Sequence, residues 1–286
     1  MKALRTTESF EERWGSRTPA GVVARYAVLI ILVGLFIGPF FWMVSIAVRG
    51  SGSIYELELI PDEPTLMNFV ETWKNFGFAR AFVNSVIVAV CTVGLNVLFS
   101  SLAAYPLARL RFPGANVVFF LILSTLMIPF QLYMVPLFLL ARDLHLINTL
   151  TGIILPGSVG AFGVFMIKQY YSTIPRDLEE AARIDGAGEF GIWARIMLPL
   201  TQPAVAAMAI FIFVGNWSSF LWPLIIINSE DKYTLPIAVA KLSGAFIDKT
   251  QYIAAGSVIA VAPVIILFFF LQRYFIGGLT LGAVKG

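Results

Sequence analysis

The charged residues of this chain are clustered, and long uncharged apolar stretches separate the clusters. These stretches are Tyr26–Val48, Ala81–Ala108, Phe112–Ala141, Leu146–Ile167, Ile196–Ser229 and Thr250–Gln272. Each is longer than the roughly 20 residues that an α-helix needs to cross about 30 Å of hydrocarbon. The pattern therefore predicts an all-α integral membrane protein with six transmembrane helices.

Two other classes of structure fit this pattern poorly. Transmembrane β-strands are about 10 residues long and alternate in polarity, which these stretches do not. Apolar helices also form the cores of large soluble proteins, but only 13% of the 286 residues are charged, about half the usual fraction. Too little polar surface remains to cover six buried helices.

The distribution of basic residues predicts which ends of the spans face the cytoplasm, because cytoplasmic loops are enriched in Lys and Arg. With the N-terminus inside, thirteen of the twenty Lys and Arg residues fall on the cytoplasmic side. We therefore expect a cytoplasmic N-terminal segment at 1–25, a transmembrane domain at 26–276 and a cytoplasmic tail at 277–286. The first span is too long for a signal peptide, so we expect it to remain uncleaved.

The longest polar interruption on the inner side includes residues 172–199. Pro175 suits the first position of a helix, and the acidic residues that follow favour the positive end of its dipole. Gly186 is well placed to end this helix, because glycine adopts the left-handed conformation without strain. A second short helix, at about Glu189–Met197, then leads into the fifth span. The segment predicts a surface on which another protein docks, or alternatively an ordinary solvated loop.

A spaced motif within this segment resembles a known family. Its residues are Glu180-Ala181-Ala182, Gly186, Ile196, Leu198 and Pro199. They match without a gap the EAA motif of permease subunits of binding-protein-dependent ABC importers. The resemblance is to the carbohydrate branch of this family, and within it to the second, maltose-permease G-like subunit. It rests on the sequence around the motif, on the Asn84-Ser85 pair and on the C-terminal segment Gly278–Gly286. The resemblance covers nearly the whole chain and implies the type I ABC importer permease fold in a bacterial inner membrane.

The resemblance implies that the helix carrying the motif is a coupling helix seated in a cleft of an ATPase subunit. Glu180 would then pair with a basic residue of the ATPase, and Gly186 would permit the turn. The expected ATPase-coupling residues are Leu178, Glu180, Ala181, Ala182, Asp185, Gly186, Ala187 and Phe190. The small Ala181 and Ala182 side chains would let the backbone of the partner approach closely. The chain has no phosphate-binding P-loop sequence, so we expect no enzymatic activity here and ATP hydrolysis on a partner.

Two further contacts follow from the resemblance. The tail residues Val284, Lys285 and Gly286 are expected to reach the ATPase dimer, although a frayed terminus is the alternative. The outside loop Asn228–Lys249 is expected to contact the solute-binding protein through Gly244, Ala245 and Phe246, or to be a plain connection. The expected partners are a second permease subunit, two ATPase subunits, an extracytoplasmic binding protein and the lipid bilayer, without nucleic acid.

Polar and aromatic side chains inside the spans are candidates for the solute pathway, because such groups are costly against lipid. The candidates are Asn84, Asn96, Gln131, Tyr133, Asn216, Trp217, Ser218, Ser219 and Trp222. Aromatic faces and amide donors suit the CH surfaces and hydroxyls of a sugar. The same residue types also hold helices together by packing and hydrogen bonds, which is the alternative role for each.

We therefore expect a sugar-importing permease subunit without cofactor or metal. A secondary transporter would be expected to carry an ion-coordinating site at the membrane midplane, and none is evident. A membrane enzyme would require clustered His, Cys or carboxylates, whereas the chain has one His and one Cys. Within the importer class, glycerol phosphates, polyols and osmolytes remain alternative solutes. No Lys or Arg lies inside a span, which disfavours an anionic solute.

Overall fold

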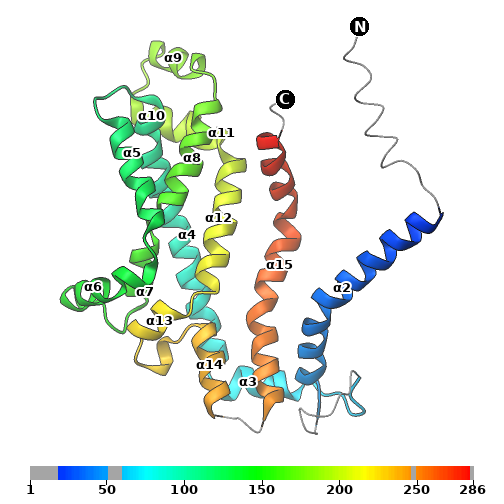
Figure 1. Ribbon diagram of the computed structural model, residues 1–286. Helices are drawn as coiled ribbons and strands as arrows, with labels where there is room; N and C mark the ends of the chain where they lie inside the picture. Colours follow the sequence, from blue (N-terminus) through cyan, green and yellow to red (C-terminus); the bar gives the residue numbers. More distant parts are fainter. Residues whose placement is uncertain (1–18, 51–59, 246–248, 284–286) are drawn as a thin grey trace.

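The computed structural model describes residues 19–50, 60–245 and 249–283. These ranges are mainly helical, which confirms the predicted all-α fold class (Figure 1). The α-helices are α2 (Pro19–Ala47), α3 (Met67–Asn75), α4 (Phe78–Arg109), α5 (Ala115–Ser124), α6 (Phe130–Asp143), α7 (Leu150–Gly157), α8 (Ala161–Thr173), α9 (Asp177–Ile184), α10 (Glu189–Ile192), α11 (Leu198–Leu200), α12 (Gln202–Trp217), α13 (Leu221–Ile226), α14 (Leu235–Ala245) and α15 (Thr250–Ala283). The 3-10 helices η1 (Thr125–Met127) and η3 (Glu230–Lys232) and the π-helix η2 (Trp193–Met197) complete the helical elements of the described chain.

Three helical segments are long and apolar enough to cross a membrane without a break, namely Gly21–Ala47, Phe78–Arg109 and Thr250–Phe270. Three further crossings are bent pairs of helices. These pairs are Ala115–Met127 with Phe130–Asp143, Leu150–Gly157 with Ala161–Thr173, and Glu189–Leu200 with Gln202–Trp217. When each bent pair is counted as one crossing, the described chain has the six spans that the apolar stretches predict.

The third span is not the continuous helix that its uncharged sequence suggests. Its two halves are bent by 101° between Met127 and Phe130. Ile128 has extended backbone angles (φ −89°, ψ 111°), because a residue that precedes proline is pushed away from the helical region. Pro129 also lacks the N–H that would continue the hydrogen-bond ladder. Hydropathy therefore located this crossing, and the proline determines where it bends.

The fourth and fifth spans are also bent, by 42° and 77° respectively. Gly160 has extended backbone angles immediately before α8, and Thr201 separates α11 from α12. The fifth pair starts at Glu189 rather than at Ile196, because η2 and α11 join the predicted second loop helix to the membrane segment. Helix α10 and η2 together cover Glu189–Met197, the range in which the sequence predicts the second loop helix.

The centre of the bundle is α4, which lies beside α8 and α12 (Figure 1). Its contact with α8 depends on glycine. A Cβ atom at Gly163 would lie 2.4 Å from Ser100 Oγ and 2.7 Å from Asn96 Oδ1. Small residues at such crossings let helix backbones approach closely inside a membrane. Asn96 also donates a hydrogen bond to the Gly157 carbonyl at 3.0 Å, so it acts in helix packing.

The two connections that the sequence predicts on the outside, called the outer connections below, contain helices that the uncharged stretches did not indicate. The segment between the first two spans includes α3, and the predicted loop Asn228–Lys249 includes η3 and α14. The Asn68 side chain of α3 donates hydrogen bonds to the carbonyls of Ala47 and Arg49 at 3.0 and 2.8 Å. These bonds fasten α3 to the end of α2. The described parts of both connections therefore contain regular helices.

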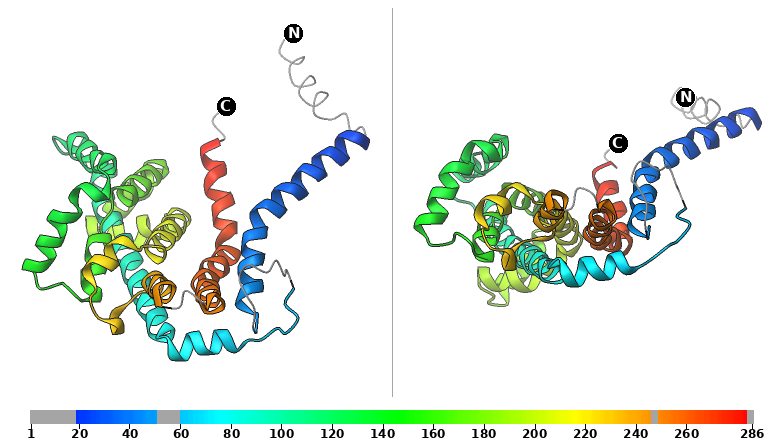
Figure 2. Two further views of the ribbon diagram at one scale, coloured as in Figure 1. Left: turned by 60° about the horizontal axis from the view of Figure 1, so that its bottom comes forward. Right: turned by 90° about the horizontal axis from the view of Figure 1, so that it is seen from below.

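The first span lies at the edge of the bundle, where it packs against the last span, α15. Figures 1 and 2 show α15 and α2 on the side of the bundle opposite α6. The apolar side chains of α2 are exposed along most of its length, for example Ile30 at 69% and Phe36 at 71%. Apolar exposure of this extent requires a lipid or protein environment rather than water.

The last helix continues past the predicted end of the membrane domain at 276. It continues to Ala283, so most of the expected tail at 277–286 is helical and only 284–286 lie outside the described residues. In Figure 1 the end of α15 and the whole of α9 lie toward the same end of the molecule, whereas α3 and α14 lie at the other end. This arrangement separates a face that carries the motif from a face that carries the outer connections.

Candidate functional site

The helix–turn–helix predicted around the motif is present. Helix α9 covers Asp177–Ile184, and Gly186 follows with φ +83°. The Ala187 N–H bonds to the Ala182 carbonyl at 2.9 Å and the Gly186 N–H bonds to the Arg183 carbonyl at 3.1 Å. These two bonds form a Schellman motif, which requires a left-handed residue at the position of Gly186. The predicted reason for this glycine is therefore confirmed.

One side of α9 faces away from the bundle. Ile184 is 86% exposed and Leu178 is 45% exposed, and Phe190 beyond the turn is 71% exposed. The Glu180, Ala181 and Asp185 side chains are exposed as well. Figure 1 shows α9 at the extreme end of the molecule, so no other described element covers this side. We call the exposed residues Leu178, Glu180, Ala181, Ile184, Asp185 and Phe190 the docking face.

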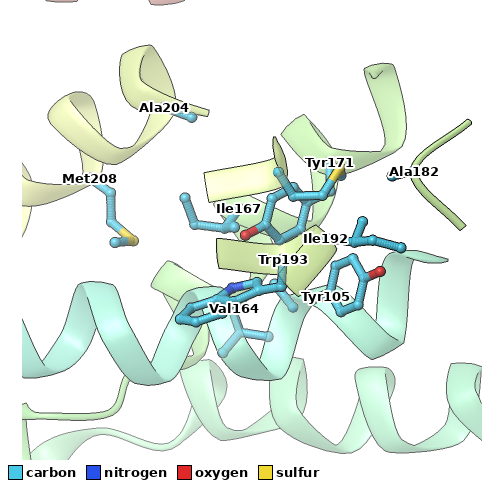
Figure 3. Close-up of a cluster of buried hydrophobic side chains, with 11 residues drawn as sticks. Tyr105, Val164, Ile167, Tyr171, Ala182, Ile192, Trp193, Ala204 and Met208 are labelled. Atoms are coloured by element: carbon cyan, nitrogen blue, oxygen red, sulfur yellow. The ribbon is translucent and has the colours of Figure 1, made fainter. Parts of the chain in front are cut away.

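Ala182 does not belong to the docking face, contrary to expectation. It is only 9% exposed and packs in a cluster with Tyr171 and Ile192 (Figure 3). It lies three residues after the buried Glu179, on the side of α9 that faces the bundle, so its small side chain packs against this chain's own core. Ala187, also expected to contact the ATPase, is partly buried against the same cluster. Ile184, which the sequence analysis did not single out, takes their place on the exposed side.

The cluster beneath α9 joins the loop helices to three helices of the bundle. Its buried members come from α4, α8, the loop helices and α12 (Figure 3). Tyr171, Ile192 and Met197 are fully buried. A packed core of this kind transmits displacement instead of absorbing it, because protein interiors have low compressibility. The docking face therefore lies on a helix that packs against a rigid core.

A buried ion pair also anchors α9, and sequence reasoning missed it. Arg109 Nε lies 2.7 Å from Glu179 Oε1, and both side chains are 3% exposed. An Arg109 terminal nitrogen also donates a hydrogen bond to the Ile174 carbonyl at 2.6 Å. From the sequence, Glu179 had only a helix-dipole role. Its i, i+3 spacing with Ala182 gave no signal of burial, because Ala182 itself was expected on the exposed side.

A second polar link joins the far arm of the loop to α4. Glu189 accepts a hydrogen bond from the Tyr105 hydroxyl at 2.5 Å and two bonds from the Arg183 guanidinium at 2.8 and 3.1 Å. The bond to Glu189 is the main cause that raises the pKa of Arg183 above its usual value. Arg183 therefore stays charged, and it bridges α9 to α10 across the glycine turn.

Three of the predicted solute-pathway residues have their donors engaged within the chain. Asn84 donates to the Asp231 and Tyr233 carbonyls at 3.0 and 2.9 Å. The Trp217 indole donates to Ala260 at 2.8 Å, and the Trp222 indole donates to Gly152 at 3.0 Å. All three side chains are less than 8% exposed. Their geometry matches the helix-packing role that the sequence left open.

The remaining candidates lie in two separate places. Gln131 and Tyr133 are exposed on α6, which Figures 1 and 2 place on the opposite side of the bundle from α15. At the end of α12, Ser218 is exposed, while Asn216 and Ser219 are partly buried. The structure therefore does not gather the predicted residues into one site.

An apolar cavity of about 630 Å³ opens beside the end of α12. Trp217 and Ser218 line it together with Phe40 of α2 and Ser257 and Val264 of α15. No charged residue is among its lining residues. A pocket with an aromatic wall and few hydroxyls is typical of sites for uncharged organic groups.

The predicted contacts outside the membrane and at the C-terminus are only partly described. Gly244 is exposed on α14 and lines a second cavity of about 540 Å³ with Lys241 and Leu224. Ala245 is the last residue of α14. Phe246 and the tail residues Val284, Lys285 and Gly286 lie outside the described residues.

The motif lies in the part of the chain that matches a known family. Residues 96–280 match the family described as "Binding-protein-dependent transport system inner membrane component". The matched range contains the whole of the docking face and the ion pair beneath it. The family carries a permease function in transport rather than an enzymatic one.

Curated relatives are permease proteins of sugar transport systems. The arabinooligosaccharides transport system permease protein AraQ of Halalkalibacterium halodurans is 46% identical over 79% of this chain and 81% of its own length. The protein of the same name from Bacillus subtilis is 39% identical over 92% of this chain and 96% of its own length. The lactose transport system permease protein LacG of Rhizobium radiobacter is 33% identical over 92% of this chain and 96% of its own length.

The fold has a solved counterpart. A chain of a bacterial ABC transporter involved in the import of the acidic polysaccharide alginate superposes with a TM-score of 0.81, at 24% identity, over 90% of this chain and 97% of that chain. The resemblance to an ABC importer permease is thus confirmed by fold and by sequence. The chain belongs to the family of binding-protein-dependent transport system inner membrane components.

Proposed function

We propose that this chain is one permease subunit of an ATP-driven importer, and that a separate ATPase moves it through the docking face of α9. The main observation in support is that α9 is exposed on one side and anchored to the bundle on the other. Ile184 is 86% exposed, while Glu179 on the same helix is held in a buried ion pair at 2.7 Å. A helix that is exposed on one side and fixed on the other can receive a force and transmit it.

The solute we propose is a neutral oligosaccharide. The relatives named for arabinooligosaccharides, lactose and melibiose, raffinose and stachyose support this class. The cavity beside Trp217 supports it as well, because its lining includes aromatic rings, Ser218 and Ser257, and no charged residue. An anionic solute would require cationic side chains or oriented N–H groups to replace its hydration.

The proposed assembly contains a second permease subunit, two ATPase subunits and an extracytoplasmic solute-binding protein. The exposed apolar surface of α2 supports an environment of lipid and partner helices. We infer that the face carrying α9 points into the cytoplasm, with both chain termini, and that α3 and α14 point outward to the binding protein. The enrichment of Lys and Arg on the α9 side supports this orientation in a bacterial inner membrane.

The test is uptake by proteoliposomes that contain the complete importer with its binding protein. With ATP supplied on the α9 side, labelled arabino-oligosaccharide should accumulate. The Glu180→Lys variant should still insert into the membrane, but it should bind less ATPase and transport less sugar. Asp143→Asn, which changes an exposed carboxylate away from α9, is the matched control and should transport normally. Uptake without ATP, or full uptake by the Glu180→Lys variant, contradicts the proposal.

A further inference from the structure

We propose that Arg109 and Glu179 are positioning residues of the transport cycle. Their ion pair would fix α9 to the end of α4, so that a displacement of α9 is carried along α4 to the opposite face of the bundle. This inference rests on the proposed docking of an ATPase on α9. It adds a named mechanical link between that docking face and the outer connections.

The link is strongest at the α9 end. Arg109 belongs to the last turn of α4 and contacts both Glu179 of α9 and the Ile174 carbonyl just before α9, at 2.7 and 2.6 Å. Glu179 also lies 3.5 Å from Arg183. With 3% of each side chain exposed, water does not screen the pair between Arg109 and Glu179. The base of α9 cannot slide along α4 without separating two buried charges.

A second contact makes the attachment two-sided. Tyr105 lies one turn before Arg109 and donates to Glu189 at 2.5 Å, on the other arm of the glycine turn. The two arms of the loop are therefore fastened to the same turn of α4. An attachment at two points resists rotation of α9 as well as translation.

The opposite end of α4 has its own polar attachments. Asn84 bonds to the carbonyls of Asp231 and Tyr233 at 3.0 and 2.9 Å. Ser85 accepts a bond from the Leu235 N–H at 2.8 Å, at the start of α14. A helix of 32 residues is about 48 Å long. Helix α4 thus extends from the docking face to the outer connections and is hydrogen-bonded at both ends.

A buried ion pair at this position is better explained by a positioning role than by a stabilising one. Replacing a buried ion pair by apolar side chains often leaves stability unchanged or improves it, so such a pair is weak evidence for a stabilising role. An ion pair does, however, restrict the relative placement of its partners, since any shift leaves the charges unsolvated. Stability and position can therefore be separated by replacing both charges together.

The experiment compares the wild-type importer with the double variant Arg109→Met/Glu179→Met, each as the complete complex. Amide hydrogen exchange over residues 177–187, without ATP or solute, reports how firmly α9 is held. The amount of sugar transported per ATP hydrolysed, in proteoliposomes, reports coupling. The thermal unfolding midpoint of the complex reports stability.

We expect the double variant to keep the wild-type midpoint, to exchange the α9 amides about tenfold faster and to transport about fivefold less sugar per ATP. Unchanged exchange overturns the proposal whatever the transport ratio. A wild-type transport ratio with faster exchange overturns it too, because α9 would then be loosened without consequence. A lower midpoint accompanied by proportional loss of both ATP hydrolysis and transport indicates a purely structural pair and also overturns it.

The matched control is Arg142→Met/Asp143→Met, which removes an ion pair of 3.0 Å whose side chains are 60% and 64% exposed. It should leave all three measurements unchanged. If the wild-type complex shows no ATP-driven sugar uptake, the proposed function fails. The exchange measurement still decides whether α9 is held by the pair, because it requires neither sugar nor ATP.

Discussion

Arg109 at the end of α4 and Glu179 in α9 form a buried ion pair, with Nε 2.7 Å from Oε1. The pair joins the apolar centre of the bundle to the helix that carries the family motif. Next to it, Ala182 packs into the core while Ile184 is exposed. The motif helix therefore has one side that is buried against the bundle, here called the held side, and one side that is exposed. Substitutions on the two sides are expected to have different effects.

The held side should be sensitive to loss of one charge. Glu179→Gln leaves Arg109 buried without a counter-charge, which costs about 3–5 kcal/mol when one partner of a buried pair is removed. Thermal unfolding of the purified importer should show this as a clear fall in midpoint. Asp143→Asn, at an exposed pair, should change stability by less than about 1 kcal/mol. Equal midpoints for the two variants contradict the burial of Glu179.

Substitutions at Gly186 should be destabilising to the extent that the new residue disfavours a positive φ angle. Gly186 has φ +83° and open space around it, so Gly186→Ala should cost about 1–2 kcal/mol from the left-handed conformation alone. Gly186→Pro should be far worse, because proline fixes φ near −65°. ATPase co-purification should fall in this order. Gly188→Ala is the control, since Gly188 has φ −75°, and it should retain the ATPase.

The sequence predicted this turn correctly because the cause is local. A helix pattern, acidic residues in its first turn and a following glycine all lie within ten positions of one another. Arg109 and Glu179 meet only after α4, α8 and α9 have packed, so no local pattern links them. The expectation for Ala182 failed for the same reason: composition shows that the residue is small, but only the fold shows which surface it contacts.

The bends in the membrane spans illustrate a second limit. Hydropathy identified each crossing, because the transfer of apolar side chains from water depends on composition alone. It carried no information on continuity. Pro129 lies at the 101° bend, whereas Pro106 lies inside the unbroken helix α4. Whether a proline interrupts a helix depends on neighbours that supply the missing contacts.

The contact between α4 and α8 should not accept a larger residue at Gly163. A Cβ atom there would lie 2.4 Å from Ser100 Oγ and 3.0 Å from the Met208 sulfur. Gly163→Val should therefore lower the stability of the purified complex by about 1–3 kcal/mol through overpacking. Gly94→Ala is the control on α4, because a Cβ atom at Gly94 would have nothing within 4 Å of it. Similar midpoints for both variants count against the close helix contact.

Asn84 should act through structure and not through solute contact. Its amide bonds to the carbonyls of Asp231 and Tyr233, so Asn84→Ala should destabilise the complex by about 1–3 kcal/mol by leaving those groups unpaired. In transport assays the maximal rate should fall while the KM for sugar stays unchanged. A raised KM at an unchanged maximal rate indicates direct solute binding and contradicts the packing role.

Site-specific photo-crosslinking from α9 tests the central claim most directly. A photoreactive phenylalanine analogue is placed at Ile184, which is 86% exposed, and in a parallel variant at Ala182, which is 9% exposed. In the complete importer the group at position 184 should crosslink to the ATPase subunit, and the group at position 182 should crosslink within the permease chain. Absence of ATPase crosslinks from position 184, in a complex that still imports sugar with ATP, would contradict the account.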